Sequence, residues 1–304
     1  MKYLLTNLLK TIPVLFLVTL IVFLLVRVTG DPVSLMLPEN ATFEEKESLR
    51  EALGFNEPLY KQYFTYLGDL VQGNFGESLR YNTDAFSLVL ERLPATIELA
   101  IASMVIAILI SVPLGIWSAI RRNSFIDLFI TGGSVLGKAM PNFWLGIMLI
   151  LFFSVQMGIF PVSGRGGLLH LVLPAIALGT GIAAEMTRLI RSSMLEILGQ
   201  DFVRTARSKG LKEAIVINTH AFRNALIPVV TIMALQTSTL IGGTLITETV
   251  FAWPGMGQLL IQAVNLRDMA VVQAATFLIA VFVIVSNLLA DLVYRLLDPR
   301  IKYD

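Results

Sequence analysis

The amino-acid sequence predicts an all-α polytopic membrane protein with six transmembrane helices. Hydrophobic residues make up 55% of the 304 positions, charged residues only 15%, and the mean hydropathy is +0.74. These values exclude a soluble globule of ordinary composition. Six stretches reach the length of about 20 apolar residues that crosses the hydrocarbon core of a membrane. They cover residues 8–28, 96–120, 125–155, 171–190, 225–248 and 271–293.

The first apolar stretch follows Lys2 and Lys10, as the core of a signal peptide would. It lacks a small-residue cleavage site, and five further apolar stretches follow it. We therefore expect residues 1–30 to form an uncleaved N-terminal transmembrane helix.

The distribution of Lys and Arg predicts the orientation, because loops rich in these residues stay in the cytoplasm. One set of chain ends and loops contains Lys2, Lys10, Arg121, Arg122, Arg188, Arg191, Arg204, Arg207, Lys209, Lys212, Arg223, Arg295, Arg300 and Lys302. The opposite set contains Arg27, Lys46, Arg50, Lys61, Arg80, Arg92, Arg165 and Arg267. The first set is larger, so we expect both termini in the cytoplasm and residues 31–94 outside it.

The segment 31–94 is acidic, with eleven Asp and Glu residues against five Lys and Arg residues. Its pattern predicts one amphipathic helix over 44–53, stopped by Gly54, and a second over 58–71. One face of the second helix is expected to carry Tyr60, Tyr63, Phe64 and Leu67. We expect a small helical cap on the outer helix ends, with contact to an external partner as the alternative.

Several kinds of chemistry are excluded by residue content. The chain has no cysteine and only two histidines, His170 and His220, so neither a thiolate site nor a conventional zinc site is expected. The net charge of +1 and the lack of a Lys/Arg run argue against nucleic acid. Ser163 and His170 share a short turn-like loop and do not make a credible nucleophile and base. We predict no catalytic residues and no metal site.

Residues 132–139 come close to the phosphate-binding pattern G-x-x-x-x-G-K-[ST], but Ala139 replaces the required hydroxyl residue. The stretch also lies within an apolar span instead of following a strand. The glycines are better explained as positions of close helix–helix packing.

Lys138 is unusual because a lysine in the middle of a membrane helix costs about 2.5–3.5 kcal/mol on insertion scales. It is expected to line a pathway; the alternative is that Pro141 breaks the helix and places Lys138 near an interface. Glu98, Glu185 and Glu248 lie nearer predicted helix ends, where their side chains are expected to reach toward water, and Asp291 is positioned to pair with Arg295.

The segment 192–224 is predicted to form two short helices around a turn at Gly210, the second over 212–222. The apolar face of the first is expected to contain Met194, Leu195, Leu198, Phe202 and Ala206. Small residues and basic residues alternate before Gly210, which would let another surface approach the backbone and orient by charge. A basic inner loop alone is explained by membrane topology, but this ordered alternation favours a docking site.

Residues 204–210 read R-T-A-R-S-K-G, and residues 220–228 read H-A-F-R-N-A-L-I-P. Further motifs are G-D-P at 30–32, L-G at 53–54, P-L-Y at 58–60, G-N-F-G-E-S at 73–78, E-T-V-F-A-W-P-G-M-G at 248–257 and D-P-R at 298–300. Together they resemble the permease subunits of ABC importers of the dipeptide, oligopeptide and nickel type, specifically the first, or B-type, membrane subunit. The departures are Arg204 in place of glutamate, Asn74 in place of aspartate, and Lys138 in an apolar stretch.

The resemblance implies a type I importer permease fold whose five-helix core occupies residues 95–304. It also implies that the chain itself holds no cofactor, whereas two partner ATPase subunits bind ATP and magnesium. Other implied partners are a second permease, an extracytoplasmic substrate-binding protein and the lipid of a bacterial or archaeal plasma membrane. The implied ATPase-coupling residues are Asp201, Phe202, Arg204, Thr205, Ala206, Arg207, Lys209, Gly210 and His220. The candidate translocation path comprises Lys138, Pro141, Asn142, Trp253, Pro254 and Gly255.

Di- and oligopeptides are the expected cargo, and nickel chelates, glutathione and sugar oligomers are alternatives. A different class, an ion-coupled secondary transporter using Lys138 and Glu248, would be favoured by inverted repeats. The sequence shows no such repeats.

Overall fold

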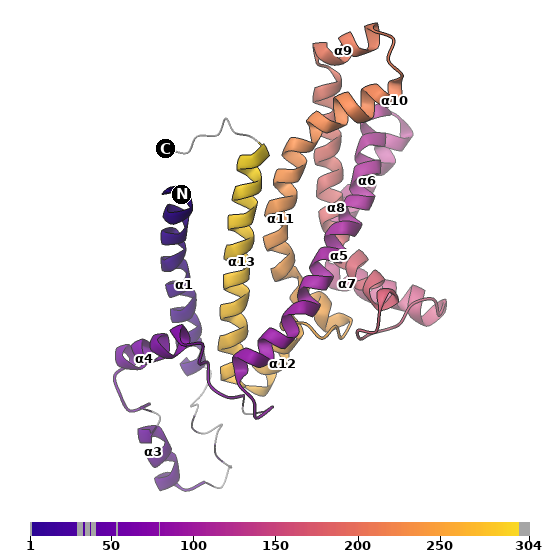
Figure 1. The fold of residues 1–304 in the computed structure, drawn as a ribbon. Helices are drawn as coiled ribbons and strands as arrows, with labels where there is room; N and C mark the ends of the chain where they lie inside the picture. The colour runs from indigo at the N-terminus through magenta and orange to yellow at the C-terminus, as the bar shows by residue number, and fades with distance from the viewer. Residues whose placement is uncertain are drawn as a thin grey trace. The chain divides into compact units, whose positions relative to one another are not determined.

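The computed structural model describes residues 2–28, 33, 37, 41–52, 54–78 and 80–297, and these are helical apart from turns and one isolated bridge between Glu77 and Asp84 (Figure 1). The motifs at 30–32 and 298–300, Leu53, and the side chain of Arg295 lie outside the described part. The chain divides into two compact units. The first comprises Met1–Ala95 and Gly255–Ile284, and the second comprises Thr96–Pro254 and Val285–Asp304.

The helices confirm an all-helical membrane fold. Helices α5 (Ala85–Ile120), α8 (Leu168–Leu198) and α13 (Met269–Leu297) are each long and apolar enough to cross a membrane. Two bent helix pairs raise the number of candidate spans in the described residues to five. Helix α1 (Lys2–Val28) covers the first expected span, but its described apolar part, Thr11–Leu25, is too short to pass the same test. The sixth span therefore stays a prediction.

The first unit contains α1, α3 (Phe43–Ala52) and α4 (Leu59–Val71), close to the two helices predicted for the acidic segment. The predicted apolar face of α4 is only partly right. Tyr63 is buried, and its hydroxyl lies 2.9 Å from that of Thr19, but Tyr60 and Phe64 are exposed. Helix α4 is rotated so that Tyr63 and Tyr66 contact Phe23 of α1. Burial of Tyr66 raises its pKa to about 12.

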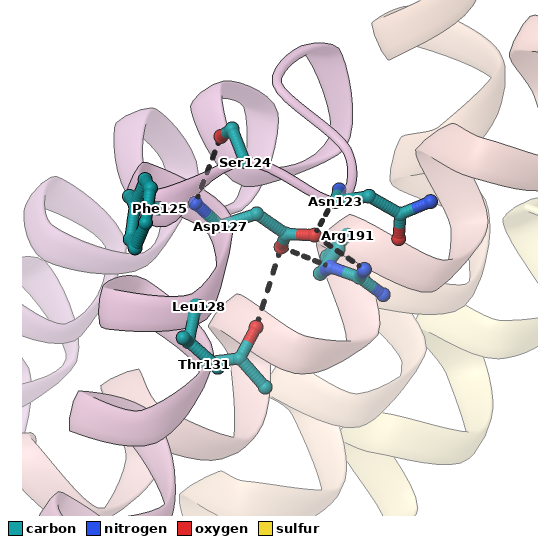
Figure 2. Close-up of a pocket in the computed structure, with 7 residues that line it drawn as sticks. All are labelled: Asn123, Ser124, Phe125, Asp127, Leu128, Thr131 and Arg191. Carbon is teal, nitrogen blue, oxygen red and sulfur yellow. Dashed lines mark hydrogen bonds and ion pairs between the residues drawn. The ribbon is translucent and has the colours of Figure 1, made fainter.

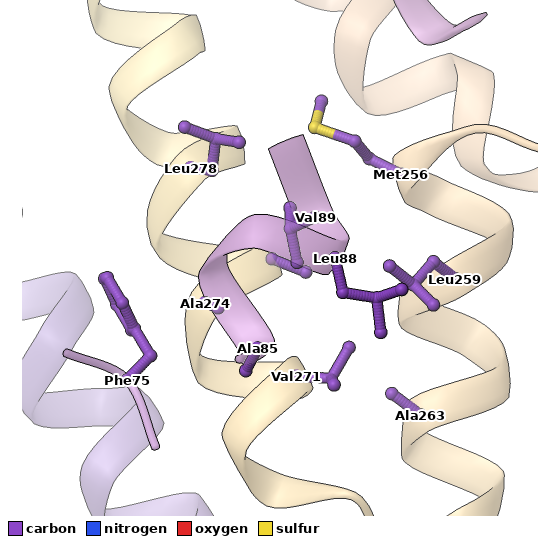
Figure 3. Packing of buried hydrophobic residues seen from close by; sticks show 11 residues of the cluster. Phe75, Ala85, Leu88, Val89, Met256, Leu259, Ala263, Val271, Ala274 and Leu278 are labelled. Carbon is purple, nitrogen blue, oxygen red and sulfur yellow. The ribbon is translucent and has the colours of Figure 1, made fainter. Parts of the chain in front are cut away.

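A second part of this unit packs the start of α5 against α12 (Met256–Leu266) and α13 (Figure 3). Its buried residues are Phe75, Ala85, Leu88, Val89, Met256, Leu259, Ala263, Val271, Ala274, Ala275 and Leu278. Helix α12 ends at Leu266, and Arg267, which follows it, has a left-handed φ of 55°. Asp268 then accepts a hydrogen bond from the Val271 amide at the start of α13. The Ser78 hydroxyl donates to the same carboxylate at 2.5 Å, which ties the loop before α5 to the α12–α13 turn.

The second unit is built around α8, which packs against α6 (Phe125–Ala139), α7 (Asn142–Leu149) and α11 (Arg223–Val250). Glycine allows close approach at Gly179, where an added Cβ would lie 2.7 Å from the Ser103 carbonyl oxygen. Gly137 also packs on α8, but Gly132 and Gly133 have no atom within 4 Å of an added Cβ. The packing explanation of the glycine-rich stretch is therefore confirmed for Gly137 and wrong, within this chain, for the other two.

The third predicted span, 125–155, is not one straight helix. Helices α6 and α7, the latter continued by a π-helical segment over Ile150–Gln156, meet at an angle of 104°. Met140 adopts an extended conformation with ψ of 126°, as expected for a residue before proline. Pro141 itself lacks the amide that would continue α6. The break at Pro141, given above as the alternative for this stretch, is therefore observed.

Candidate functional site

The segment 192–224 projects from the end of the α8–α11 pair (Figure 1). Helix α8 ends at Leu198, and a new helix, α9, runs from Asp201 to Ser208. Gly210, with φ of +73°, turns the chain into α10 (Glu213–Ile215) and a π-helical segment, η2 (Val216–Phe222), which leads into α11. The predicted pair of helices around Gly210 is confirmed.

The inner side of this hairpin is a small apolar cluster. Val203 and Ala206 of α9 are buried against Val216, with Ile197 and Leu198 beside them. Phe202, which was expected on this face, is 44% exposed instead. The reason is that α9 starts afresh after Gln200, so the periodicity of α8 does not continue through it. Sequence reasoning missed Val203, although its position three residues before Ala206 is a recognisable signal.

The outer side of α9 and the turn is exposed and mixes charge with apolar surface. Of the predicted coupling residues, Asp201, Phe202, Arg204, Thr205, Arg207, Lys209 and Gly210 lie here, whereas Ala206 is buried and His220 is partly buried. Leu211 and Ile215 add exposed apolar side chains that were not predicted. The side chain of Ala206 faces the hairpin's own core and is not accessible from outside.

An ion pair joins the two helices of the hairpin. The Arg207 guanidinium donates from Nη2 to Glu213 Oε1 at 2.6 Å and from Nε to Oε2 at 3.2 Å. This forked hydrogen bonding raises the pKa of Arg207 above its usual value. Glu213 was not predicted because it lies on the far side of the turn. The pair links the last turn of α9 to the first residue of α10.

A second ion pair links α6 to α8 and lines a surface pocket of about 580 Å³ (Figure 2). Asp127 is buried and accepts from Arg191 Nε at 2.7 Å and from Nη2 at 2.8 Å. Its carboxylate also accepts from the Ser118 hydroxyl at 2.5 Å and from the Asn123 amide at 2.9 Å. The Asp127 amide donates to Ser124, which caps α6. Because Arg191 lies two turns before the end of α8, this pair holds α6 to the helix that carries the hairpin.

The intramembrane acidic residues have specific partners. The Lys138 ammonium contacts Glu185 at 2.7 Å, and Arg165 contacts Glu98 at 2.6 Å. Glu248 is fully buried and accepts from the Thr96 hydroxyl at 2.7 Å. The expectation that Glu248 reaches toward water is therefore wrong, because an internal hydroxyl takes the place of water.

The loop after α11 is held from inside the unit. Phe251 is buried against Leu173 and Ala177, and an added Cβ on Gly146 would lie 3.0 Å from its ring. Trp253 has no exposed surface, its amide donates to the Glu248 carbonyl at 2.8 Å, and the Arg165 guanidinium carbon lies 5.9 Å from its ring centroid. Pro254 remains partly exposed.

No group of three His, Cys, Asp or Glu residues that could hold a metal occurs in the part of the chain that the structure describes. The geometry found here is that of an exposed hairpin on a helical membrane unit, with polar side chains paired between the helices. It supports docking and conformational coupling.

Comparisons with known proteins agree with this geometry. Residues 111–303 match the family described as binding-protein-dependent transport system inner membrane component, and residues 1–100 match the N-terminal part of such membrane components. The chain is 42% identical over 313 residues to the oligopeptide transport system permease protein AppB of Bacillus subtilis (strain 168), covering 99% of each chain.

Two further relatives are similar to nearly the same extent. The di/tripeptide transport system permease protein DppB of Pseudomonas aeruginosa (strain UCBPP-PA14) is 43% identical over 323 residues, covering 96% of each chain. The glutathione transport system permease protein GsiC of Escherichia coli (strain K12) is 40% identical over 304 residues, covering all of this chain and 99% of that protein.

The fold is similar to that of a solved structure of the MetNI methionine ABC transporter in an inward-facing conformation. The TM-score is 0.58 at 19% identity, and the match covers 69% of this chain and 96% of that one. At this identity the likeness supports the fold alone.

Proposed function

Because the chain belongs to the inner membrane components of binding-protein-dependent transport systems, we propose that it forms one half of the membrane pore of an ATP-driven importer of di- and oligopeptides. The observation that carries this proposal is the exposed hairpin 201–215, braced by its own apolar cluster and by the Arg207–Glu213 pair. The peptide cargo is supported by similarity to AppB and DppB over nearly the whole chain. The chain itself carries out no catalysis.

The hairpin is the proposed contact with an ATPase subunit. A docked helix transmits motion only if it cannot swing independently, and α9 is held by Val203 and Ala206 inside and by Arg207 at its end. Phe202, Leu211 and Ile215 offer apolar surface to a partner, while Arg204 and Lys209 orient the approach. His220 is partly buried in η2, and its proposed role is to support the hairpin and not to contact the ATPase.

The proposed partners are two ATPase subunits, which bind ATP and magnesium, a related second permease and an external substrate-binding protein. Closure of the ATPase pair would move the hairpin, and α8 and α11 would move with it because both connect directly to the hairpin. The Lys/Arg distribution supports a cytoplasmic location of this face. Such coupling requires two membrane arrangements that the ATPase binds with different affinity.

The proposed translocation path uses the bend between α6 and α7, where Lys138, Pro141 and Asn142 gather. At the loop after α11, Pro254 is partly exposed and is the remaining element of the proposed path, whereas Gly255, which was expected on it, is buried. Trp253 supports that loop from below, since its indole has no exposed surface.

Glutathione is the second candidate cargo, because GsiC is nearly as similar to the chain as the peptide permeases are. Glutathione is itself a modified tripeptide, so the two candidates share charged termini and amide groups. Uptake of labelled dipeptides and of glutathione by the reconstituted complex, in competition with each other, separates them.

The coupling role is tested by Gly210→Arg, with Gly73→Arg as a matched control. Both glycines follow a helix end, have φ near +75° (+73° and +78°), donate their amide to the carbonyl three residues back, and have no atom within 4 Å of an added Cβ. Backbone strain is therefore similar in the two variants, about 1–2 kcal/mol. Gly210→Arg should remain in the membrane but lose co-purification with the ATPase and ATP-dependent uptake, whereas Gly73→Arg should keep co-purification. ATPase retention by Gly210→Arg would refute the assignment of the hairpin.

A further inference from the structure

The ion pair between Lys138 and Glu185 lies inside the membrane unit but is not sequestered there. The Lys138 side chain is 50% exposed and the Glu185 side chain is 34% exposed, although their charged ends are 2.7 Å apart. Both side chains therefore keep free surface that another molecule can contact. A structural ion pair between two helices would ordinarily be closed to such contact, as Asp127 is at the other end of α6.

Both residues lie far from the helix end next to the predicted cytoplasmic loops, and Lys138 is the last residue but one of α6, beside the bend at Pro141. Lys138 is about 20 Å along α6 from its start at Phe125, and Glu185 is about 20 Å from the end of α8 at Leu198, at 1.5 Å per residue. Lipid tails do not solvate charge at this depth, so exposed ionic groups here face a water-filled path or a partner molecule.

A third polar group completes the site. Asn142 begins α7, directly after the bend that Pro141 imposes, and its Oδ1 lies 3.8 Å from the position of an added Cβ on Gly181. Gly181 and Glu185 are four residues apart on α8 and so lie on the same face, one turn apart. The bend thus places the side-chain amide of Asn142 about one helical turn from the Glu185 carboxylate. The Lys138 ammonium is bound to that same carboxylate.

We propose that Lys138, Glu185 and Asn142 form a cargo-binding site for a peptide with free termini, in which Lys138 receives the terminal carboxylate and Glu185 receives the terminal ammonium. This inference rests on the proposed function and specifies the part of the path that touches cargo. The empty site neutralises itself through the Lys138–Glu185 contact. A zwitterionic peptide replaces that contact with two contacts of the same kind, so net charge inside the membrane does not change.

The amide of Asn142 can both donate and accept, which matches a peptide bond. The site therefore has a partner for the terminal ammonium, the terminal carboxylate and a peptide bond, which all short peptides share. It does not select among peptides by their side chains. A peptide lacking one terminal charge would break the internal pair and leave Lys138 or Glu185 without a counter-charge, which is unfavourable in a poorly solvated site.

The test combines three peptides with wild type and two variants and compares their binding affinities. Equilibrium binding is measured on the purified complex of the two permeases and two ATPase subunits, without the substrate-binding protein. The probes are trialanine, N-acetyl-trialanine and trialanine amide. Wild type should bind trialanine about tenfold more tightly than either blocked peptide, as expected for loss of one charged contact. Lys138→Gln should bind trialanine about tenfold more weakly but no longer distinguish it from the amide, and Glu185→Gln should no longer distinguish it from the acetylated peptide.

Glu98→Gln is the matched control, because Glu98 has a similar ion pair of 2.6 Å and similar exposure, 38%, elsewhere in the unit. It should leave all three affinities unchanged. Equal loss of affinity for all probes in Lys138→Gln and Glu185→Gln, with impaired co-purification of the partner chains, would assign the pair to assembly and overturn the proposal. Absence of saturable trialanine binding to wild type would overturn it as well.

Failure of the proposed function gives a different result. If the complex with its binding protein takes up no peptide in the presence of ATP, the cargo assignment itself fails. Normal uptake with an unaltered pattern of terminal preference in both variants leaves the importer function standing and removes only this site.

Discussion

Replacement of Asp127 by asparagine should loosen the contact between α6 and α8 without changing side-chain size. Asp127 is buried and receives two hydrogen bonds from Arg191, one from Asn123 and a longer one from Thr131 (Figure 2). The Ser118 hydroxyl donates a further one. The asparagine amide nitrogen would meet one of these donors instead of accepting from it. Arg191, whose side chain is 26% exposed, would lose a charge-assisted partner but gain some hydration.

Hydrogen bonds to charged groups contribute about 1.5–3 kcal/mol each, and partial hydration of Arg191 reduces the loss, so we expect Asp127→Asn to lower the free energy of unfolding by about 2–3 kcal/mol. Arg191→Lys keeps the charge but not the fork and should cost about 1–1.5 kcal/mol. In the double variant Asp127→Asn/Arg191→Gln, the two effects should be less than additive by about 2 kcal/mol.

The measurement is SDS-induced unfolding in mixed micelles, followed for wild type, for the single variants Asp127→Asn, Arg191→Lys and Arg191→Gln, and for the double variant Asp127→Asn/Arg191→Gln. Asp201→Asn is the control, because its pair with Arg204 is 3.8 Å long and both side chains are highly exposed. That control should change stability by less than about 0.5 kcal/mol. Additivity of the Asp127 and Arg191 variants within about 0.5 kcal/mol would show that the two residues do not stabilise each other and would refute the reasoning.

Two further predictions concern packing inside the second unit. Gly179→Ala should lower the free energy of unfolding by about 1–3 kcal/mol, because the added Cβ would lie 2.7 Å from the Ser103 carbonyl oxygen. Gly181→Ala on the same helix is the control and should be neutral or stabilising. Equal changes of the two variants in thermal unfolding would contradict this. Thr96→Val should cost about 1–3 kcal/mol by removing a hydrogen bond to buried Glu248, while Thr96→Ser should retain wild-type stability. Loss of stability in both Thr96 variants would assign the effect to packing of the methyl group.

Much of the fold could be predicted because a membrane-spanning helix requires a continuous run of about 20 apolar residues, which is visible in the sequence. Hydropathy located α11 and α13 to within about four residues at each end, but it missed the first three turns of α5 and the last two turns of α8. The two halves of the hairpin and the turn at Gly210 were also predictable, since glycine with φ of +73° leaves a signature in sequence.

Predictions failed where the outcome depended on a distant neighbour. Periodicity placed Phe202 with the apolar residues of α8, but the break after Leu198 turned it outward. Glu248 was expected near water because it follows a long apolar run, yet Thr96, far away in sequence, satisfies it inside the unit. Tyr60 and Phe64 are aromatic like Tyr63, but they are exposed whereas Tyr63 is buried.

The sequence by itself determined that this is a helical membrane protein with an ordered basic hairpin, because hydropathy, glycine and charge act over a few neighbouring residues. Only the tertiary structure decided which charged groups pair, that the third apolar stretch bends by 104°, and that Lys138 meets Glu185 at that bend. Partner choice across dozens of residues follows from how helices pack, and packing depends on contacts that no local pattern records.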